Sequence, residues 1–158
     1  MPIEICLREV QDTDLPEFWE QVTDPQGQQM AAVTRDYHYD RDQFDQFWAM
    51  VRADTAVIVR TVLADGVVAG HAAVFGPPSG REVTYVIARR FWGHGVATAA
   101  LAQLIDLEPA RPLYADAAAD NAGSIRVLEK CGFAVTGRSR TFARARGEEI
   151  ELVHLTLG

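Results

Sequence analysis

The segment Arg90-Phe91-Trp92-Gly93-His94-Gly95-Val96-Ala97-Thr98 is the most informative stretch of this chain. It joins a strand-like run at residues 82–88 to a helix-like run at residues 96–106. Two glycines at a strand-to-helix turn leave backbone N–H groups bare, and the first helical turn adds unpaired donors and the positive end of the helix dipole. The turn therefore predicts a cradle for an anion such as a phosphate or pyrophosphate.

The residues on either side of this turn alternate between strand and helix patterns. Further helices are expected over Leu15 to Val22, over residues 44–51 and between Asn121 and Gly132. Strand-like runs lie at residues 3–8, 56–63, 67–75, 82–88, 113–117, 133–144 and 149–157. The order β, α, α, β, β, β, α, β, α, β, β predicts an α/β fold in which a mixed sheet carries helices on its faces.

Turn and cap signals separate these elements. Asp65-Gly66 predicts a hairpin between two strands, and Asp12-Thr13-Asp14 supplies N-cap candidates for the first helix. Asp24-Pro25-Gln26-Gly27 ends that helix, and residues 28–41 are expected to form a loop with a short helix.

Composition limits the class of protein. The chain has 158 residues, 48% of them apolar, so we expect one domain over residues 1–158. A net charge of −7 at pH 7 argues against general binding to nucleic acid or to an anionic membrane. No apolar run approaches the roughly 20 residues of a membrane span, and the N-terminus lacks the features of a signal peptide. Cys6 and Cys131 show no metal spacing and are expected to be free thiols, which favours a cytoplasmic location.

One interpretation of the glycine turn is a dinucleotide-binding site. Gly93-x-Gly95-x-x-Thr98 is close to the G-x-G-x-x-G/A fingerprint, and Asp116 follows the next strand, where an acid would bind a ribose. Three points oppose this reading. Thr98 replaces the third small residue, at least three strands precede the turn, and the chain after Asp116 is short and ends in an antiparallel pair.

A second motif favours a different ligand. Arg90-x-x-Gly93-x-Gly95 resembles the acyl-CoA pyrophosphate loop of the GNAT N-acetyltransferase superfamily, and the segment from Asn121 to Phe133 resembles that superfamily's second signature. Tyr85 and the residues of the turn resemble the subgroup that includes ribosomal-protein N-terminal acetyltransferases. The resemblance implies a mostly antiparallel twisted sheet of about seven strands, with helices on both faces and a splay at the acyl-CoA site.

The resemblance also indicates which residues would hold acyl-CoA. In such enzymes the strand before the turn holds the pantetheine arm, and the backbone amides of the turn hold the pyrophosphate. The residues concerned here are Val86, Ile87, Ala88, Arg90, Phe91, Trp92, Gly93, His94, Gly95, Val96, Ala97, Thr98, Asn121 and Ser124. His94 stands where Lys or Arg is usual; because histidine is mostly neutral at pH 7, we expect tighter CoA binding at pH 6 than at pH 8.

Two of these residues, Asn121 and Ser124, are also predicted to be catalytic. They are three residues apart on one helix face, and the resemblance implies that they face the pantetheine and the thioester. Many relatives carry, in place of Leu128, a Tyr that protonates the departing thiolate. Leu128 cannot do this, so Ser124 or a water would take the role, or the thiolate would leave into solvent.

An amine that attacks a thioester needs a free lone pair. At pH 7 deprotonation costs about 4.6 kcal/mol for an amine of pKa ~10.4 and about 1.4 kcal/mol for a peptide α-amine of pKa ~8. Glu82, just before the cofactor strand, is the leading candidate for the general base, directly or through water. His71, Asp116 and Asp120 are weaker candidates, and His38 is a candidate for the acceptor side.

The sequence thus predicts an acetyl-CoA-dependent N-acetyltransferase that acts by direct attack on the thioester. The acceptor would be a protein N-terminus or a small-molecule amine, and the protein a monomer or homodimer. Neither a Ser/His/Asp arrangement nor a metal-ligand cluster is expected. A non-catalytic acyl-CoA-binding module of the same fold is the alternative.

Overall fold

A computed structural model describes residues 2–31 and 40–158 of the chain. Its centre is a seven-stranded sheet in the order β1-β2-β3-β4-β5-β7-β6, in which β4 and β5 are parallel and all other neighbours antiparallel. The strands are β1 Ile5–Arg8, β2 Ile58–Ala64, β3 Val67–Phe75, β4 Arg81–Ile87, β5 Leu113–Ala118, β6 Ala134–Ala143 and β7 Glu148–Leu157. The predicted mixed, mostly antiparallel sheet is confirmed.

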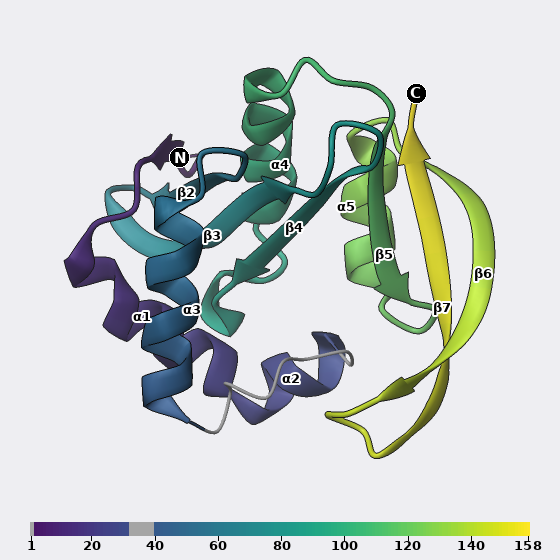
Figure 1. Ribbon diagram of the computed structural model, residues 1–158, viewed down its shortest axis with the longest axis horizontal. Coiled ribbons are helices and arrows are strands. Elements are labelled where there is room, and N and C mark those ends of the chain that lie inside the picture. The colour runs from purple at the N-terminus through teal and green to yellow at the C-terminus, as the bar shows by residue number, and fades with distance from the viewer. Residues whose placement is uncertain (1, 32–39) are drawn as a thin grey trace.

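Helices cover both faces of this sheet, as predicted (Figure 1). The helices are α1 Leu15–Thr23, α2 Pro25–Ala31, α3 Arg41–Ala53, α4 Val96–Leu107 and α5 Ala122–Lys130. One core, built from Phe18, Val22, Phe44 and Trp48, lies where α1 and α3 pack on the sheet. The larger core lies on the opposite face under α4 and α5, with Leu101, Leu104, Leu113 and Leu128 fully buried.

The sheet opens between its two parallel strands. β4 and β5 pair only at Arg81↔Leu113 and Glu82↔Tyr114, and beyond these pairs the strands diverge (Figure 1). β4 keeps its register with β3 over the same length, from Phe75↔Glu82 to Gly70↔Ile87. One edge of β4 is therefore free of strand partners, and the predicted splay is confirmed.

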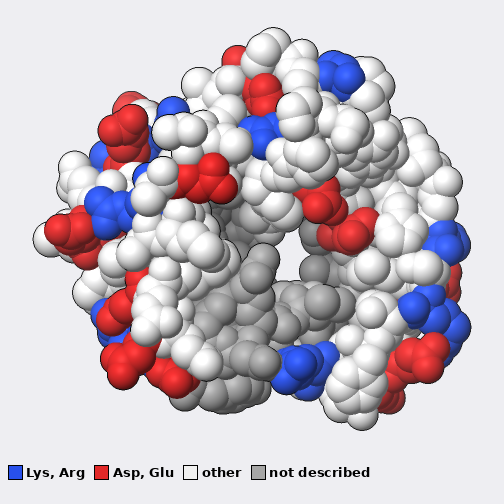
Figure 2. All heavy atoms as spheres, viewed as in Figure 1, with Lys and Arg blue, Asp and Glu red and all other residues white. Residues whose placement is uncertain are grey.

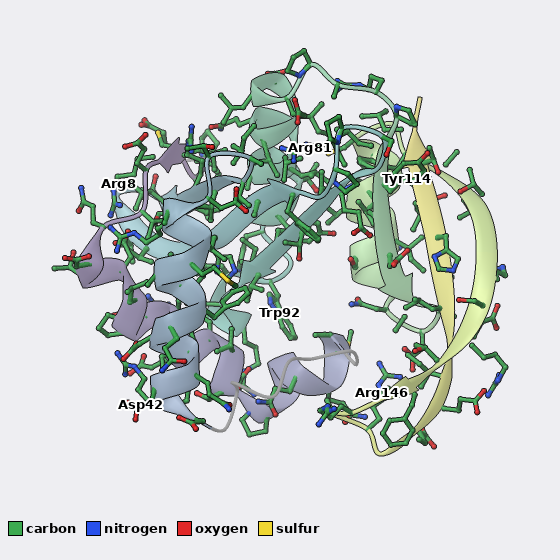
Figure 3. The ribbon with its side chains drawn as sticks, in the orientation of Figure 1. Arg8, Asp42, Arg81, Trp92, Tyr114 and Arg146 are labelled. Carbon is green, nitrogen blue, oxygen red and sulfur yellow. The ribbon has the colours of Figure 1, made fainter. Side chains whose placement is uncertain are left out.

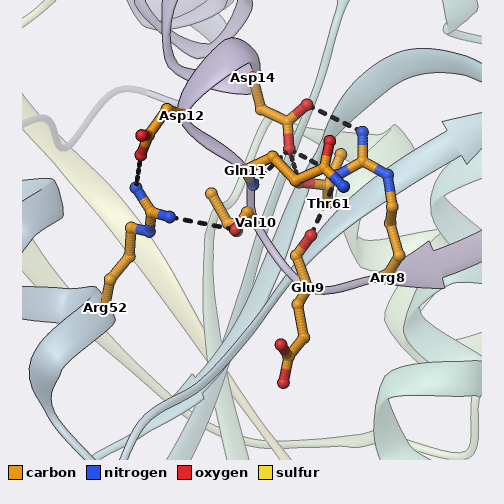
Figure 4. A network of polar contacts seen from close by, with 8 residues as sticks. All are labelled: Arg8, Glu9, Val10, Gln11, Asp12, Asp14, Arg52 and Thr61. Carbon is orange, nitrogen blue, oxygen red and sulfur yellow. Dashed lines mark hydrogen bonds and ion pairs between the residues drawn. The ribbon is translucent and has the colours of Figure 1, made fainter.

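A polar network fixes the start of α1 against the first two strands (Figure 4). Asp14 is buried and accepts hydrogen bonds from Arg8 at 2.7 and 2.9 Å, from Thr61 Oγ1 at 2.6 Å and from the N–H of Gln11 at 2.9 Å. Burial alone would raise the pKa of Asp14, but these hydrogen bonds outweigh it and lower the pKa to about 2. Asp14 does occupy the N-cap position of α1, but its side chain forms no cap bond, because Arg8 and Thr61 engage it instead.

The region after α1 differs in detail from the expectation. α1 ends at Thr23, as the signal at Asp24 predicts, but the next helix begins at once with Pro25 and runs to Ala31. Proline suits a first helical position because the N–H that it lacks would have no helical partner there. The Asp24 carboxylate accepts from the N–H of Gly27 at 3.0 Å. Residues 32–39, with the candidate His38, lie outside the described part of the chain.

The other local signals are confirmed. Asp65 and Gly66 have φ of 49° and 81°, as a tight hairpin turn requires. Asn121 caps α5 by accepting from the N–H of Ser124, and Gly132 follows the end of α5 with φ of 98°. α5, which lies within the second sequence motif, is thus fixed at both ends.

Candidate functional site

A cleft of about 1490 Å³ lies where β4 and β5 diverge. Its walls come from β4, the turn before α4, the first turns of α4 and α5, and parts of α1, α2, α3 and β5. Figure 2 shows an opening near the middle of the molecule, with acidic side chains above it and a basic group below. The cleft has two chemically different parts, a donor half around the glycine turn and an acceptor half between α1, α2, α3 and the diverging strands.

The donor half is built mainly from backbone. Gly93 and Gly95 both have φ of 77°, and a Cβ at either position would meet nothing within 4 Å. Backbone conformation, and not lack of space, is therefore the reason for glycine here. Gly95 offers α4 no side-chain cap, and the N–H of Ala99 bonds to Gly95 C=O at 3.1 Å. The N–H groups of the preceding first turn are left for an anion in the cleft.

Cations line the same half of the cleft. Arg90, Arg126 and Lys130 are exposed on its wall, and the Arg90 guanidinium lies over the ring of Phe91 at 4.9 Å. Thirteen of the fourteen residues predicted to hold acyl-CoA line the cleft; the exception is His94, which is exposed and lies outside its lining. Contact of the thirteen with a ligand stays a prediction.

The free edge of β4 forms the wall between the two halves. The N–H of Ala88 donates to Ala69 C=O at 2.8 Å, and backbone groups in an antiparallel strand alternate in direction. Tyr85 and Ile87 therefore direct their backbone groups away from β3 and into the cleft. Trp92 Nε1 donates to Ile87 C=O at 2.8 Å, so one carbonyl of this edge is already engaged (Figure 3).

Across the gap, the predicted pair on α5 makes specific contacts. Both polar ends of Asn121 are engaged: Oδ1 accepts from Ser124 N–H at 3.2 Å, and Nδ2 donates to Met30 C=O at 3.2 Å. Ser124 Oγ lies 2.8 Å from the hydroxyl of Tyr85, which joins α5 to β4. Leu128 is 1% exposed and belongs to the core. From the sequence, Tyr85 only indicated the subgroup. Its contact with Ser124 was not predicted, because the two residues are 39 positions apart.

Helix α2 bridges the two walls of the cleft. On the β4 side, Arg89 donates to Gln26 Oε1 at 2.5 Å. On the α5 side, Arg146 in the β6–β7 turn donates to Gln29 C=O at 2.9 Å and pairs with Asp120 at 2.5 Å (Figure 3). The hydrogen bond from Arg146 lowers the pKa of Asp120. Asp120 is thus engaged in an ion pair outside the cleft lining, which removes it as a base candidate.

Glu82 lies near Asp116 but outside the lining of the main cleft. Glu82 lies at the last pairing before β4 and β5 diverge and lines a second hollow of about 410 Å³; Asp116 lines both this hollow and the main cleft. Burial, and then the charge of Asp116, raise the pKa of Glu82. A raised pKa brings a carboxylate closer to the range in which it works as a base near neutral pH.

Asp116 is the end of a hydrogen-bonded chain that crosses three strands. Its Oδ1 lies 2.6 Å from His154 Nδ1, and His154 Nε2 lies 2.8 Å from Ser139 Oγ. The expectation that no Ser/His/Asp arrangement would occur was therefore wrong. It failed because Asp116 and His154 face each other only through the register of β5 and β7.

His71, a weaker base candidate, is buried against the rings of Phe18 and Trp48, with centroids 4.8 and 4.9 Å away. Burial lowers its pKa to about 4, so it is neutral and only weakly basic at pH 7. His71 Nδ1 and Trp48 Nε1 are buried without a hydrogen-bond partner among the described residues, and both side chains line the cleft. Acidic side chains line the same half: Glu17, Glu20, Asp24 and Asp54.

Within residues 2–31 and 40–158, no three His, Cys, Asp or Glu side chains gather so as to hold a metal ion. No helix in this part of the chain is long and apolar enough to cross a membrane.

Comparison with known families agrees with this architecture. The family model described as the acetyltransferase (GNAT) domain matches residues 4–134. The chain therefore belongs to the GNAT acetyltransferase family. A search of curated proteins finds no match.

Solved structures show the same fold. Spermidine N-acetyltransferase from Vibrio cholerae, in complex with CoA and spermine, is 16% identical with a TM-score of 0.84, over 97% of this chain and 94% of that one. Ribosomal-protein-alanine N-acetyltransferase from Brucella melitensis is 23% identical with a TM-score of 0.81, over 96% and 98%. The microcin C7 self-immunity acetyltransferase MccE, in complex with acetyl-CoA and AMP, is 15% identical with a TM-score of 0.79, over 97% and 91%.

Proposed function

We propose that this protein is an acetyl-CoA-dependent N-acetyltransferase that moves the acetyl group directly to a primary amine. The observation that carries the proposal is the continuity of one cleft. It joins an anion cradle at the start of α4 to the free edge of β4 and to Asp116 of β5, and Glu82 lines the second hollow, which shares Asp116 with the cleft. Each part of acetyl-CoA would face a part of the wall that can bind it: the pyrophosphate, the pantetheine arm and the thioester.

The donor half suits the chemistry of CoA. Pyrophosphate oxygens would accept from the N–H groups at the start of α4, with Arg90 and Lys130 supplying positive charge. The amide groups of the pantetheine arm would bond to the free backbone edge at Tyr85 and Ile87, as an added strand does. The thioester would then lie near Glu82 and Ser124, one on each wall.

In the proposed reaction the amine lone pair attacks the thioester carbonyl. The new N–C bond forms, the C–S bond breaks, and the electron pair leaves on the CoA sulfur. Glu82 takes the proton from the amine nitrogen, directly or through a water, and its raised pKa suits this role. Asp116 raises that pKa, and His154 holds Asp116 in place.

The acceptor half favours a cationic amine. The side-chain carboxylates of Glu17 and Glu20 have no ion-pair or hydrogen-bond partner among the described residues, and both residues line the cleft. Their charge would attract an ammonium group to the cleft before deprotonation. A protein N-terminus and a small-molecule amine both carry such a group, and both belong to this proposal.

The test is release of free CoA thiol from acetyl-CoA with a panel of amines, followed with a thiol reagent, beside calorimetric binding of CoA. We expect CoA to bind and thiol release to depend on the amine. If CoA binds tightly but no amine in the panel, which includes peptides and polyamines, yields thiol, the protein is a non-catalytic acyl-CoA-binding module.

A further inference from the structure

We propose that Gln21, Trp48 and His71 form a specificity pocket in the acceptor half, and that this pocket binds a neutral amide group carried by the acceptor amine. The proposal rests on the proposed acetyl transfer and narrows its acceptor to amines that also carry an amide. The three residues come from α1, α3 and β3, and all three line the main cleft.

Each of the three residues has a buried polar atom without a partner. Within residues 2–31 and 40–158, Gln21 Oε1, Trp48 Nε1 and His71 Nδ1 are the side-chain nitrogen and oxygen atoms that are buried and form no hydrogen bond. Such atoms are rare in folded proteins, because each has lost its hydrogen bonds to water and gained none in return. Three of them, from three elements, in the lining of one cleft indicate a ligand group that supplies the missing partners.

Ring packing fixes two of these atoms in place. Trp48 is 2% exposed and His71 is 8% exposed. The rings of Phe18, Trp48 and His71 contact one another, with centroids 4.8 to 4.9 Å apart. Phe18 has no polar side-chain atom that could pair with either neighbour. The pocket is therefore formed before a ligand binds, and a ligand need not order these side chains.

The pocket lies on the face of the sheet that also carries the proposed base. Glu82 and Val86 are four residues apart on β4 and so share a face, and His71 of β3 is the Cα partner of Val86. Tyr85 points to the other face, where it contacts Ser124 on α5. An acceptor whose amine is directed at the thioester would therefore extend along the face that carries His71.

The donors and acceptors of the pocket match an amide. Trp48 Nε1–H can only donate, and Gln21 Oε1 can only accept. Burial lowers the pKa of His71 to about 4, so its ring is neutral at pH 7 and Nδ1 donates or accepts according to the tautomer. An amide oxygen can accept from Trp48 while the amide N–H donates to Gln21. An alkyl group would leave all three atoms unpaired, and an ammonium group cannot accept from Trp48.

The charge of the lining opposes a carboxylate at the same place. Gln21 is four residues after Glu17 on α1, so the two are neighbours on the helix surface. The side-chain carboxylates of Glu17 and Glu20 line the cleft without an ion-pair partner among the described residues. A carboxylate on the acceptor would meet charge of its own sign, whereas a neutral amide would not. The pocket should therefore distinguish an amide from a carboxylate of the same shape.

The first test compares three amines that share one heavy-atom skeleton: β-alaninamide, β-alanine and isoamylamine. Thiol release from acetyl-CoA gives kcat/KM for each amine, expressed per concentration of free base so that differences in amine pKa cancel. We expect wild-type kcat/KM to be about tenfold or more higher for β-alaninamide than for isoamylamine, because only the amide pairs the buried atoms. The value for β-alanine should also be lower than that for β-alaninamide.

The second test removes the donor of the pocket. Trp48→Phe keeps an aromatic ring but lacks the N–H, so kcat/KM for β-alaninamide should fall by about tenfold while that for isoamylamine changes by less than about twofold. Trp19→Phe is the matched control, a half-buried tryptophan that packs edge-on against Phe44 and lies outside the cleft lining. Calorimetric binding of CoA shows whether each variant is folded and keeps an intact donor half.

The third test uses stability, and it applies even if Trp48→Phe does not fold. Gln21→Leu removes a buried atom that has no partner, so it should raise the Tm by about 1 to 4 °C and at the same time reduce the preference for β-alaninamide. Gln103→Leu is its control, because Gln103 donates to Ile5 C=O at 2.7 Å outside the cleft and its loss should lower the Tm.

The outcomes separate this inference from the proposed function. Equal kcat/KM for β-alaninamide and isoamylamine in the wild type, or an unchanged preference in a folded Gln21→Leu enzyme, overturns the amide pocket and leaves acetyl transfer in place. Absence of thiol release with any amine, including peptides and polyamines, would instead contradict the proposed function.

Discussion

The two halves of the cleft recognise their ligands by different means. The donor half uses backbone: the glycine turn, the first turn of α4 and the free edge of β4. The acceptor half uses side chains that come from α1, α3, β5 and β7. A backbone site depends on a short local sequence, whereas a side-chain site depends on how distant segments meet. The two halves should therefore respond separately to substitution.

Loss of the general base should have the largest effect. Glu82→Gln keeps the size of the side chain but cannot take a proton, so kcat should fall by about 100-fold or more while CoA affinity stays unchanged. Steady-state kinetics and calorimetry measure the two quantities. Glu148→Gln, an exposed strand carboxylate, is the control, and equal losses in both Glu variants would contradict the role of Glu82.

The pH dependence of the reaction rate of the wild type should also report the ionisation of Glu82. The base acts when ionised, so the rate should rise with pH through a pKa above the ordinary glutamate value, because burial and Asp116 raise the pKa of Glu82. In Glu82→Gln this rise should vanish, and only the ionisation of the amine should remain. An identical acid limb in both proteins would assign that limb to another group.

Substitution in the glycine turn should weaken CoA binding by the donor half. Gly95→Val places a β-branched side chain at φ of 77°, which should reshape the turn and weaken CoA binding by about tenfold or more. Gly66→Val, at φ of 81° in the β2–β3 hairpin, introduces the same strain far from the cleft. Both variants should lose stability in thermal unfolding, but Gly66→Val should bind CoA normally; if both lost CoA affinity equally, strain alone would explain the loss.

The α2 bridge should affect the acceptor half more weakly. Arg146→Ala removes the contacts to Gln29 and Asp120, and we expect the KM for the amine to rise by about 3- to 10-fold. CoA affinity should change by less than about twofold, because the glycine turn is untouched. Arg138→Ala, which loses the surface pair with Glu151, is the control. A larger effect on CoA than on the amine would place the bridge in the donor half.

The acidic lining should have the smallest effect. In Glu17→Gln combined with Glu20→Gln, the KM for a cationic amine should rise by about two- to threefold at low salt and less at high salt, because exposed charges are screened. Asp42→Asn with Asp45→Asn removes two charges from exposed positions on α3 outside the cleft lining (Asp42 is labelled in Figure 3). If the two double variants changed the KM equally, the acidic residues of the cleft would act only through the net charge of the protein.

The same contrast explains what the sequence could predict. The glycine turn, the Asn121 cap and the Asp65-Gly66 hairpin are local, and each forms where its residues predict it. The seven strands follow from their period, and the splay followed from the family resemblance. In contrast, Asp12-Thr13-Asp14 supplied N-cap candidates for α1, and Asp14 takes that position, but Arg8 and Thr61 engage its carboxylate instead.

The contacts that were missed all join distant parts of the chain. Tyr85 meets Ser124 only because β4 and α5 face each other across the splay. His154 meets Asp116 and Ser139 through the pairing of three strands. Residue type and spacing contain no register, so these partners could not be chosen from the sequence.

The most direct test of the two-part cleft is a crystal structure with acetyl-CoA bound. We expect pyrophosphate oxygens within hydrogen-bond distance of the backbone N–H groups at the start of α4, and the thioester between Glu82 on one face and the Tyr85–Ser124 pair on the other. A pyrophosphate bound away from the glycine turn, or a thioester directed away from the point where β4 and β5 diverge, would contradict this account.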